Sequence, residues 1–177
     1  MILMFKIEKT GSQLDHMLRA TQFHHVQLSS MADVKANMLL TMSSVVLTLC
    51  LPQILKNSHL WPLYILMTFC LLTICLATYA VMPKLPPANL PPPDIQDPSF
   101  NILFFGDFTR LTQAQFESGM EEIMNDPSRT YGTQAREIYL LGTFLAKKKY
   151  RFLRLGYLAF ITGLFASFLG FIIEVLL

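Results

Sequence analysis

The chain has 177 residues, of which 53% are apolar and 15% are charged, and its formal net charge is +2. Soluble domains carry about 25% charged residues, so a hydrophobic core alone does not explain this composition. The weak positive charge gives no reason to expect nucleic-acid binding. The three cysteines lie in apolar runs without disulfide or metal-ligand spacing, so we expect neither a secreted disulfide scaffold nor a metal site.

Three apolar stretches predict transmembrane helices, over residues 36–55, 60–82 and 155–177. About 20 apolar residues are needed to cross the hydrocarbon core, and each stretch has that length. The first is the most polar of the three, and its alternative interpretation is a buried helix of a bundle. We therefore predict an all-α membrane protein with three transmembrane helices, so the lipid bilayer itself is the first expected partner.

The distribution of basic residues predicts the orientation of the chain. Residues 1–38 contain four lysines and arginines, the connection between the first two spans contains one, and residues 84–154 contain nine. Positive charge stays on the cytoplasmic side of a membrane. We therefore expect a cytoplasmic N-terminus, a cytoplasmic 84–154 segment and a C-terminus outside.

The cytoplasmic parts are predicted to be long helical stalks. Residues 1–35 form an N-terminal helix from Ser12 that enters the first span without a break, followed by the transmembrane hairpin 36–82. Seven of the ten prolines lie in residues 83–99, which predicts an extended strap.

Residues 100–154 form the second helical region and lead into the third span, residues 155–177. Thr112 and Gln115 form a capping-box pattern for a helix through Met124. Asp126 before Pro127 is typical of a helix start, and no later proline interrupts a single helix to the C-terminus. The phenylalanines between residues 100 and 108 are expected either to pack between helices or to lie in the headgroup layer.

Two further patterns are candidates for function. Gly156, Gly163 and Gly170 share one helix face, which indicates self-association, although glycine is common in membrane helices in any case. Asp33, just before the first span, needs a partner elsewhere, for example Lys149, Arg151 or Arg154, unless it only anchors the membrane edge. We find no nucleophile–base pair, phosphate loop or paired acids, and so expect no enzyme and no cofactor.

Three short motifs resemble the transmembrane effectors of Pycsar antiphage systems, over roughly residues 12–175. They are Ala32-Asp33-Val34-Lys35-Ala36 before the first span, Phe104-Phe105, and Glu137…Leu141…Lys149-Tyr150…Arg154 before the last span. The resemblance implies a bacterial inner-membrane effector, with a homo-oligomer as its expected form. A companion pyrimidine cyclase makes cyclic CMP or cyclic UMP on phage infection, and the effector senses this nucleotide and impairs the membrane.

A cyclic mononucleotide presents one phosphate, a ribose hydroxyl and a flat base. Its site needs a cation, an aromatic face and an amide or carboxylate. The candidate ligand residues on the cytoplasmic side are Lys35, Asn37, Phe105, Arg136, Lys149 and Tyr150, with Asp33 and Arg154 as motif residues. The alternative function is a structural scaffold that anchors a cytoplasmic partner without responding to a ligand.

Overall fold

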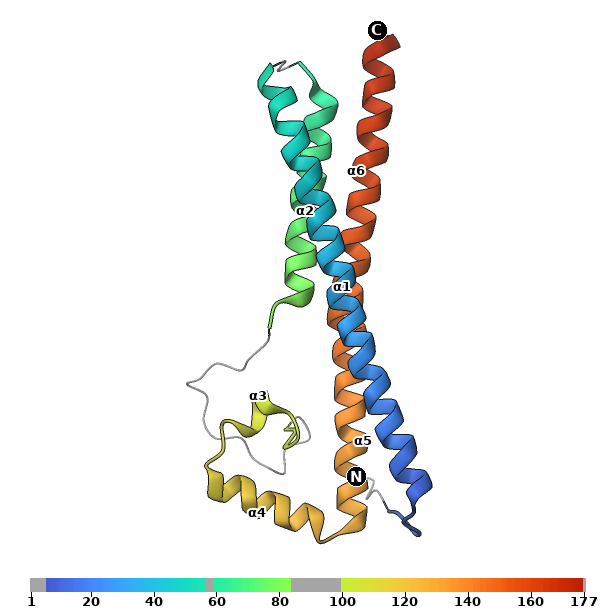
Figure 1. Cartoon of the computed structure of the whole chain (residues 1–177), viewed down its shortest axis with the longest axis vertical. Helices are drawn as coiled ribbons and strands as arrows, with labels where there is room; N and C mark the ends of the chain where they lie inside the picture. The colour runs from blue at the N-terminus through green and yellow to red at the C-terminus, as the bar shows by residue number, and fades with distance from the viewer. Residues whose placement is uncertain (1–5, 57–58, 84–99, 177) are drawn as a thin grey trace, which may run out of the picture. The chain divides into compact units, whose positions relative to one another are not determined.

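The computed structural model describes residues 6–56, 59–83 and 100–176, and every regular element among them is a helix (Figure 1). The chain divides into two compact units. The first comprises Met1–Val26 and Pro83–Thr143, and the second comprises Gln27–Met82 and Phe144–Leu177. The prediction of an all-α protein is confirmed for the described residues.

Helix α1 runs from Ser12 to Lys56, which confirms that the N-terminal helix continues into the first span. Its residues 12–26 belong to the first unit and residues 27–56 to the second. Nothing in this stretch interrupts helical backbone bonding until Pro52, which lies inside the helix near its end. Pro52 removes one backbone hydrogen bond from the ladder because proline has no N–H.

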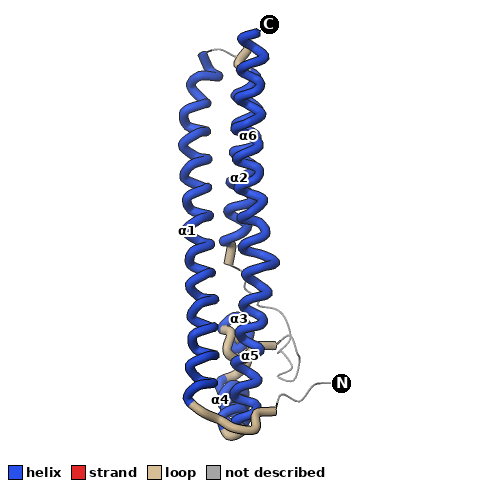
Figure 2. The backbone as a smooth tube through the Cα atoms, turned by 90° about the vertical axis from the view of Figure 1, so that its right-hand side faces the viewer, coloured by secondary structure: helices blue, strands red, loops and turns tan. Residues whose placement is uncertain are grey.

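The second unit contains the three predicted spans. Helix α2 (Trp61–Val81) starts with Pro62 near its N-terminus, where a missing N–H costs nothing, and α6 covers Arg151–Leu176. The helices containing the three predicted spans are long and apolar enough to cross a membrane, as expected. Helices α2 and α6 pack closely along their lengths (Figure 2). The core of the unit consists of Ala32, Ala36, Leu39, Cys70, Ala77, Leu153 and Phe160.

The glycine face of α6 packs inside the chain. A Cβ at Gly163 would lie 2.4 Å from the Cβ of Phe69, and one at Gly170 would lie 3.0 Å from the Cβ of Pro62. A Cβ at Gly156 would lie 3.3 Å from Cδ1 of Leu39. Within the chain, Gly163 and Gly170 therefore lie against α2, and Gly156 lies against α1 and α2. Self-association through this face stays a prediction.

The helix that leads into the third span changes its geometry once, which the sequence analysis did not predict. Helix α5 covers Pro127–Phe144, a π-helical segment η1 covers Leu145–Tyr150, and α6 follows directly. The expected single long helix is therefore confirmed over Pro127–Leu176, with one π-helical segment inside it. A π-turn accommodates one extra residue and is frequent at functional sites.

The first unit contains three more helices, α3 (Phe105–Phe108), α4 (Gln113–Met124) and α5. The predicted capping box of α4 is present, because the Thr112 hydroxyl accepts from the Gln115 N–H and the Gln115 side chain accepts from the Thr112 N–H. Asp126 Oδ1 accepts from the backbone N–H of Ser128 at 2.8 Å. Both helix starts are therefore confirmed.

The aromatic segment is divided between the interior and the surface of the first unit. Phe100 and Ile102 are buried, whereas Phe104 and Phe105 are exposed. The neighbouring strap prediction concerns residues 84–99, which lie outside the described part of the chain.

Candidate functional site

The π-helical segment η1 brings three consecutive side chains into contact with the other two helices of the second unit. Lys149 Nζ donates hydrogen bonds to both carboxylate oxygens of Asp33, at 2.6 and 2.8 Å, and to Ser29 Oγ at 2.9 Å. The Tyr150 hydroxyl donates to the backbone oxygen of Leu28 at 3.1 Å. Two neighbouring residues of η1 therefore bind α1.

Lys148 makes the contact with the remaining helix. Its Nζ lies 5.3 Å from the ring centroid of Tyr79 on α2, within the range of a cation–π interaction. The Tyr79 ring in turn contacts Phe152 edge-on, with centroids 4.5 Å apart. We call these contacts the η1 cluster: Lys148, Lys149 and Tyr150 with Tyr79, Leu28, Ser29 and Asp33.

The Lys149–Asp33 pair is unevenly exposed. The Lys149 side chain is 12% exposed and that of Asp33 is 43% exposed. An ammonium group that loses most of its water needs a compensating charge and hydrogen bonds, and Asp33 with Ser29 supplies three acceptor atoms. The sequence analysis named Lys149, Arg151 and Arg154 as possible partners of Asp33. In the structure Asp33 pairs with Lys149, while Arg151 and Arg154 are exposed.

The six candidate ligand residues fall in two different units. Lys149 and Tyr150 lie in the η1 cluster, and Lys35 and Asn37 lie on α1 of the same unit, where Lys35 is half-buried and Asn37 exposed. Phe105 on α3 and Arg136 on α5 are exposed residues of the first unit. The structure therefore brings Lys149 and Tyr150 together with Asp33, and it assigns Phe105 and Arg136 to a separate unit.

The first unit has its own polar contacts. The Tyr131 hydroxyl donates to Asp15 Oδ1 at 2.6 Å, and this hydrogen bond raises the pKa of Tyr131, with burial and the carboxylate charge acting in the same direction. The buried Asn101 binds Glu137 through its amide nitrogen and accepts from the Leu103 N–H at 3.1 Å. Asn101 thus attaches the aromatic segment to α5.

Sequence reasoning missed several members of the η1 cluster. Ser29 and Asp33 are four residues apart and so share a helix face, which was an available signal for a common partner. No sequence pattern near residues 145–150 predicted the π-turn or the Lys148–Tyr79 contact. The lysine run 147–149 is equally consistent with a group of basic residues that binds lipid headgroups.

The chain matches the family model of the Pycsar effector protein domain (PycTM) over residues 16–174. The match covers most of the chain. The chain belongs to the Pycsar effector family. Searches of curated proteins and of solved structures find no match to it.

Membership in this family supports a role in Pycsar antiphage defence and a membrane location. The matched residues of the Pycsar effector include α1 from His16 onward, α2, and α6 as far as Glu174. They also include every residue of the η1 cluster. The family assignment therefore extends over both the predicted spans and the contacts that join them.

Proposed function

We propose that this Pycsar effector senses a cyclic pyrimidine mononucleotide, cyclic CMP or cyclic UMP, on the cytoplasmic side of the bacterial inner membrane. The nucleotide comes from a companion cyclase, and the response is loss of membrane integrity followed by growth arrest or death. The observation that carries the proposal is the family match over residues 16–174 on a chain with three apolar helices. In this proposal the N-terminus is cytoplasmic and the protein acts without catalysis.

The η1 cluster suggests how an anion would act on the three helices. A phosphate oxygen and the Asp33 carboxylate are both acceptors for an ammonium group, so a cyclic nucleotide phosphate would compete with Asp33 for Lys149. The Tyr150 ring lies next to Lys149 in the chain and offers a face for the base. Loss of the Asp33 contact would weaken the attachment of α1 to η1 at the edge of the predicted spans.

The experiment is performed with the purified full-length protein in sealed proteoliposomes that hold a potassium diffusion potential. Cyclic CMP, cyclic UMP and, as a control, cyclic AMP are added at equal concentrations while a potential-sensitive dye is recorded. We expect depolarisation with one pyrimidine nucleotide only. A potential that persists with all three nucleotides contradicts the proposal.

Thermal unfolding of the detergent-solubilised protein tests binding separately from membrane damage. A ligand that binds only the folded state stabilises it by about 2.7 kcal/mol at a hundredfold excess over Kd. We expect the melting temperature to rise with the same nucleotide that depolarises the vesicles. The scaffold alternative predicts no rise with any nucleotide.

A further inference from the structure

Helix α1 has two faces of opposite character within the predicted span. One face is buried inside the second unit and carries Ala32, Ala36, Leu39, Ser43 and Cys50. The other, which we call the polar face of α1, is formed by Asn37, Thr41, Ser44 and Thr48, all exposed. A polar face directed at lipid is unfavourable, because hydrocarbon offers no hydrogen-bond partners.

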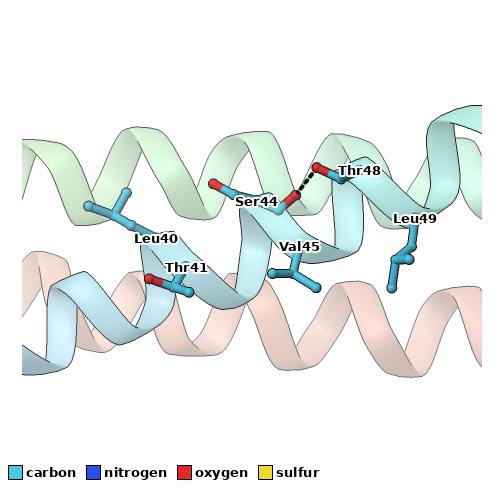
Figure 3. Close-up of a pocket in the computed structure, with 6 residues that line it drawn as sticks. All are labelled: Leu40, Thr41, Ser44, Val45, Thr48 and Leu49. Atoms are coloured by element: carbon cyan, nitrogen blue, oxygen red, sulfur yellow. Dashed lines mark hydrogen bonds between the residues drawn. The ribbon is translucent and has the colours of Figure 1, made fainter.

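Three residues of the polar face, Thr41, Ser44 and Thr48, line a shallow groove of about 470 Å³ together with the apolar Leu40, Val45 and Leu49 (Figure 3). The Thr41 and Thr48 hydroxyls each donate to a backbone oxygen four residues earlier, at 2.9 Å. These bonds satisfy the hydroxyl protons. The oxygen lone pairs stay available as acceptors on the exposed side.

Two more polar groups belong to residues on this side of α1. The Asn37 side-chain amide is exposed and makes no hydrogen bond within the described part of the chain. The backbone oxygen of Thr48 loses its usual helical partner, because residue 52 is proline and has no N–H. Both groups are close to hydrocarbon in a monomer and would gain from a polar neighbour.

We propose that the polar face of α1 packs against the same face of a second copy of this chain. Positions 37, 41, 44 and 48 are spaced four, three and four residues apart, which is the heptad spacing of a helix–helix seam. Copies inserted with the same orientation bring equal positions together. The Asn37 amide is complementary to itself, since it carries both donors and an acceptor, and such amides associate helices in membranes.

A second copy is favoured because the other close-packing surface is already used. The glycines of α6, the residues best suited to a close approach between copies, already lie against helices of the same chain, Gly163 and Gly170 against α2 and Gly156 against both α1 and α2. Exposed apolar residues on α6, such as Phe165 and Leu169, are compatible with lipid as they stand. The polar face of α1 therefore gains more from leaving lipid than the exposed apolar face of α6 does.

A further consequence rests on the proposed function. The hydroxyls of Thr41, Ser44 and Thr48, aligned between copies, provide a hydrated path along α1. Asp33 lies one turn before Asn37 and shares its side of the helix. Release of Lys149 from Asp33 would therefore change the contact between copies at Asn37, the first residue of the polar face.

The seam is tested by photo-crosslinking of the full-length protein in liposomes without nucleotide. A benzophenone amino acid replaces Val45, which is 52% exposed in the groove, or Leu169 on α6 as the control, which is 58% exposed. We expect adducts of dimer mass from position 45 and few from position 169. Equal yields from both positions, or none from position 45, overturn the proposed seam.

Asn37→Leu tests the amide without changing the groove. An interhelical hydrogen bond in a membrane is worth a change in association of about 3-fold to about 20-fold, so the adduct yield from position 45 should fall within that range. Asn37→Gln should restore part of the yield. An Asn37→Leu yield equal to that of the parent protein overturns the role of the amide.

The hydrated path is tested by Ser44→Leu combined with Thr48→Leu in the depolarisation assay. We expect several-fold slower depolarisation with the effective nucleotide, and crosslinking from position 45 in the same variant measures how far the seam itself is weakened. Unchanged depolarisation overturns the path. If the parent protein never depolarises, the proposed function fails, and the crosslinking yields alone still decide the seam.

Discussion

The ammonium of Lys149 and the carboxylate of Asp33 are 116 positions apart in the sequence, and their nearest atoms lie 2.6 Å apart in the structure. Asp33 lies on α1 just before the first predicted span, and Lys149 lies in η1 just before the third. Ser29 accepts from the same ammonium. This pair therefore joins the first and third spans at one level of the second unit, through groups that carry opposite charge.

Lys149→Met should weaken the attachment of η1 to α1. Because Asp33 is 43% exposed, solvent screens the pair, and we expect a loss of about 0.5–1 kcal/mol in the free energy of unfolding. Thermal unfolding in detergent measures it. Lys147→Met is the matched control, since Lys147 is exposed in the same segment and should shift stability by less than about 0.5 kcal/mol.

A double-mutant cycle separates the pair from the individual residues. Asp33→Asn, Lys149→Met and the double variant together give the coupling energy of the two side chains. If the ion pair is the main contact, the double variant is less destabilised than the sum of the two single variants. Strict additivity would show that the pair contributes no interaction of its own.

Gly163→Ala should disrupt the packing of α2 on α6. The added Cβ would lie 2.4 Å from the Cβ of Phe69. Because the Cβ of Phe69 is attached directly to the backbone of α2, it can move away only if α2 itself shifts. Overpacking of this kind costs about 1–3 kcal/mol, measurable as a lower unfolding temperature in detergent. Phe165→Leu on the same helix is the control, because Phe165 is 66% exposed, and it should leave that temperature nearly unchanged.

Asn101→Ala should loosen the aromatic segment of the first unit. The substitution removes the acceptor of the Leu103 N–H and the donor to Glu137. Loss of part-buried hydrogen bonds such as these costs about 0.5–1.5 kcal/mol each. Hydrogen exchange should therefore become faster in residues 100–108. Asn125→Ala, at an exposed position, serves as the control, and equal exchange in the two variants would contradict the anchoring role of Asn101.

Alkaline pH should weaken the Tyr131–Asp15 contact. The carboxylate accepts from the neutral hydroxyl and so raises the pKa of Tyr131 above its ordinary value of 10.0. The folded protein holds this proton more tightly than the unfolded chain does. The resulting stabilisation is therefore fully present below pH 10 and is lost as the pH rises through the raised pKa.

Tyr131→Phe removes this titration and isolates its effect. Between about pH 8 and about pH 11, the parent protein should lose more unfolding free energy than Tyr131→Phe does. Tyr139→Phe is the matched control on the same helix, because Tyr139 is 71% exposed; this variant should lose as much as the parent. Identical pH profiles for all three proteins would show that the Asp15 contact has no energetic role.

The sequence by itself determined the elements that depend on local composition and spacing. The three spans follow from runs of apolar residues that only a bilayer or a helix interior accommodates. The starts of α4 and α5 follow from Thr112, Gln115 and Asp126, whose side chains bind backbone groups within three residues. The family motifs before the first and last spans are also local, and the match over residues 16–174 confirms the family that they indicated.

Only the tertiary structure decided which distant residues meet. Asp33 had several basic candidates at a similar depth, and selecting Lys149 depends on the rotation of α6 against α1, which the π-turn at Leu145–Tyr150 alters. The glycines of α6 predicted a close helix contact but not its partner, because a flat helix face accepts either α2 or a second copy. Side-chain partners between helices depend on how the helices pack, and no sequence spacing within one helix contains that information.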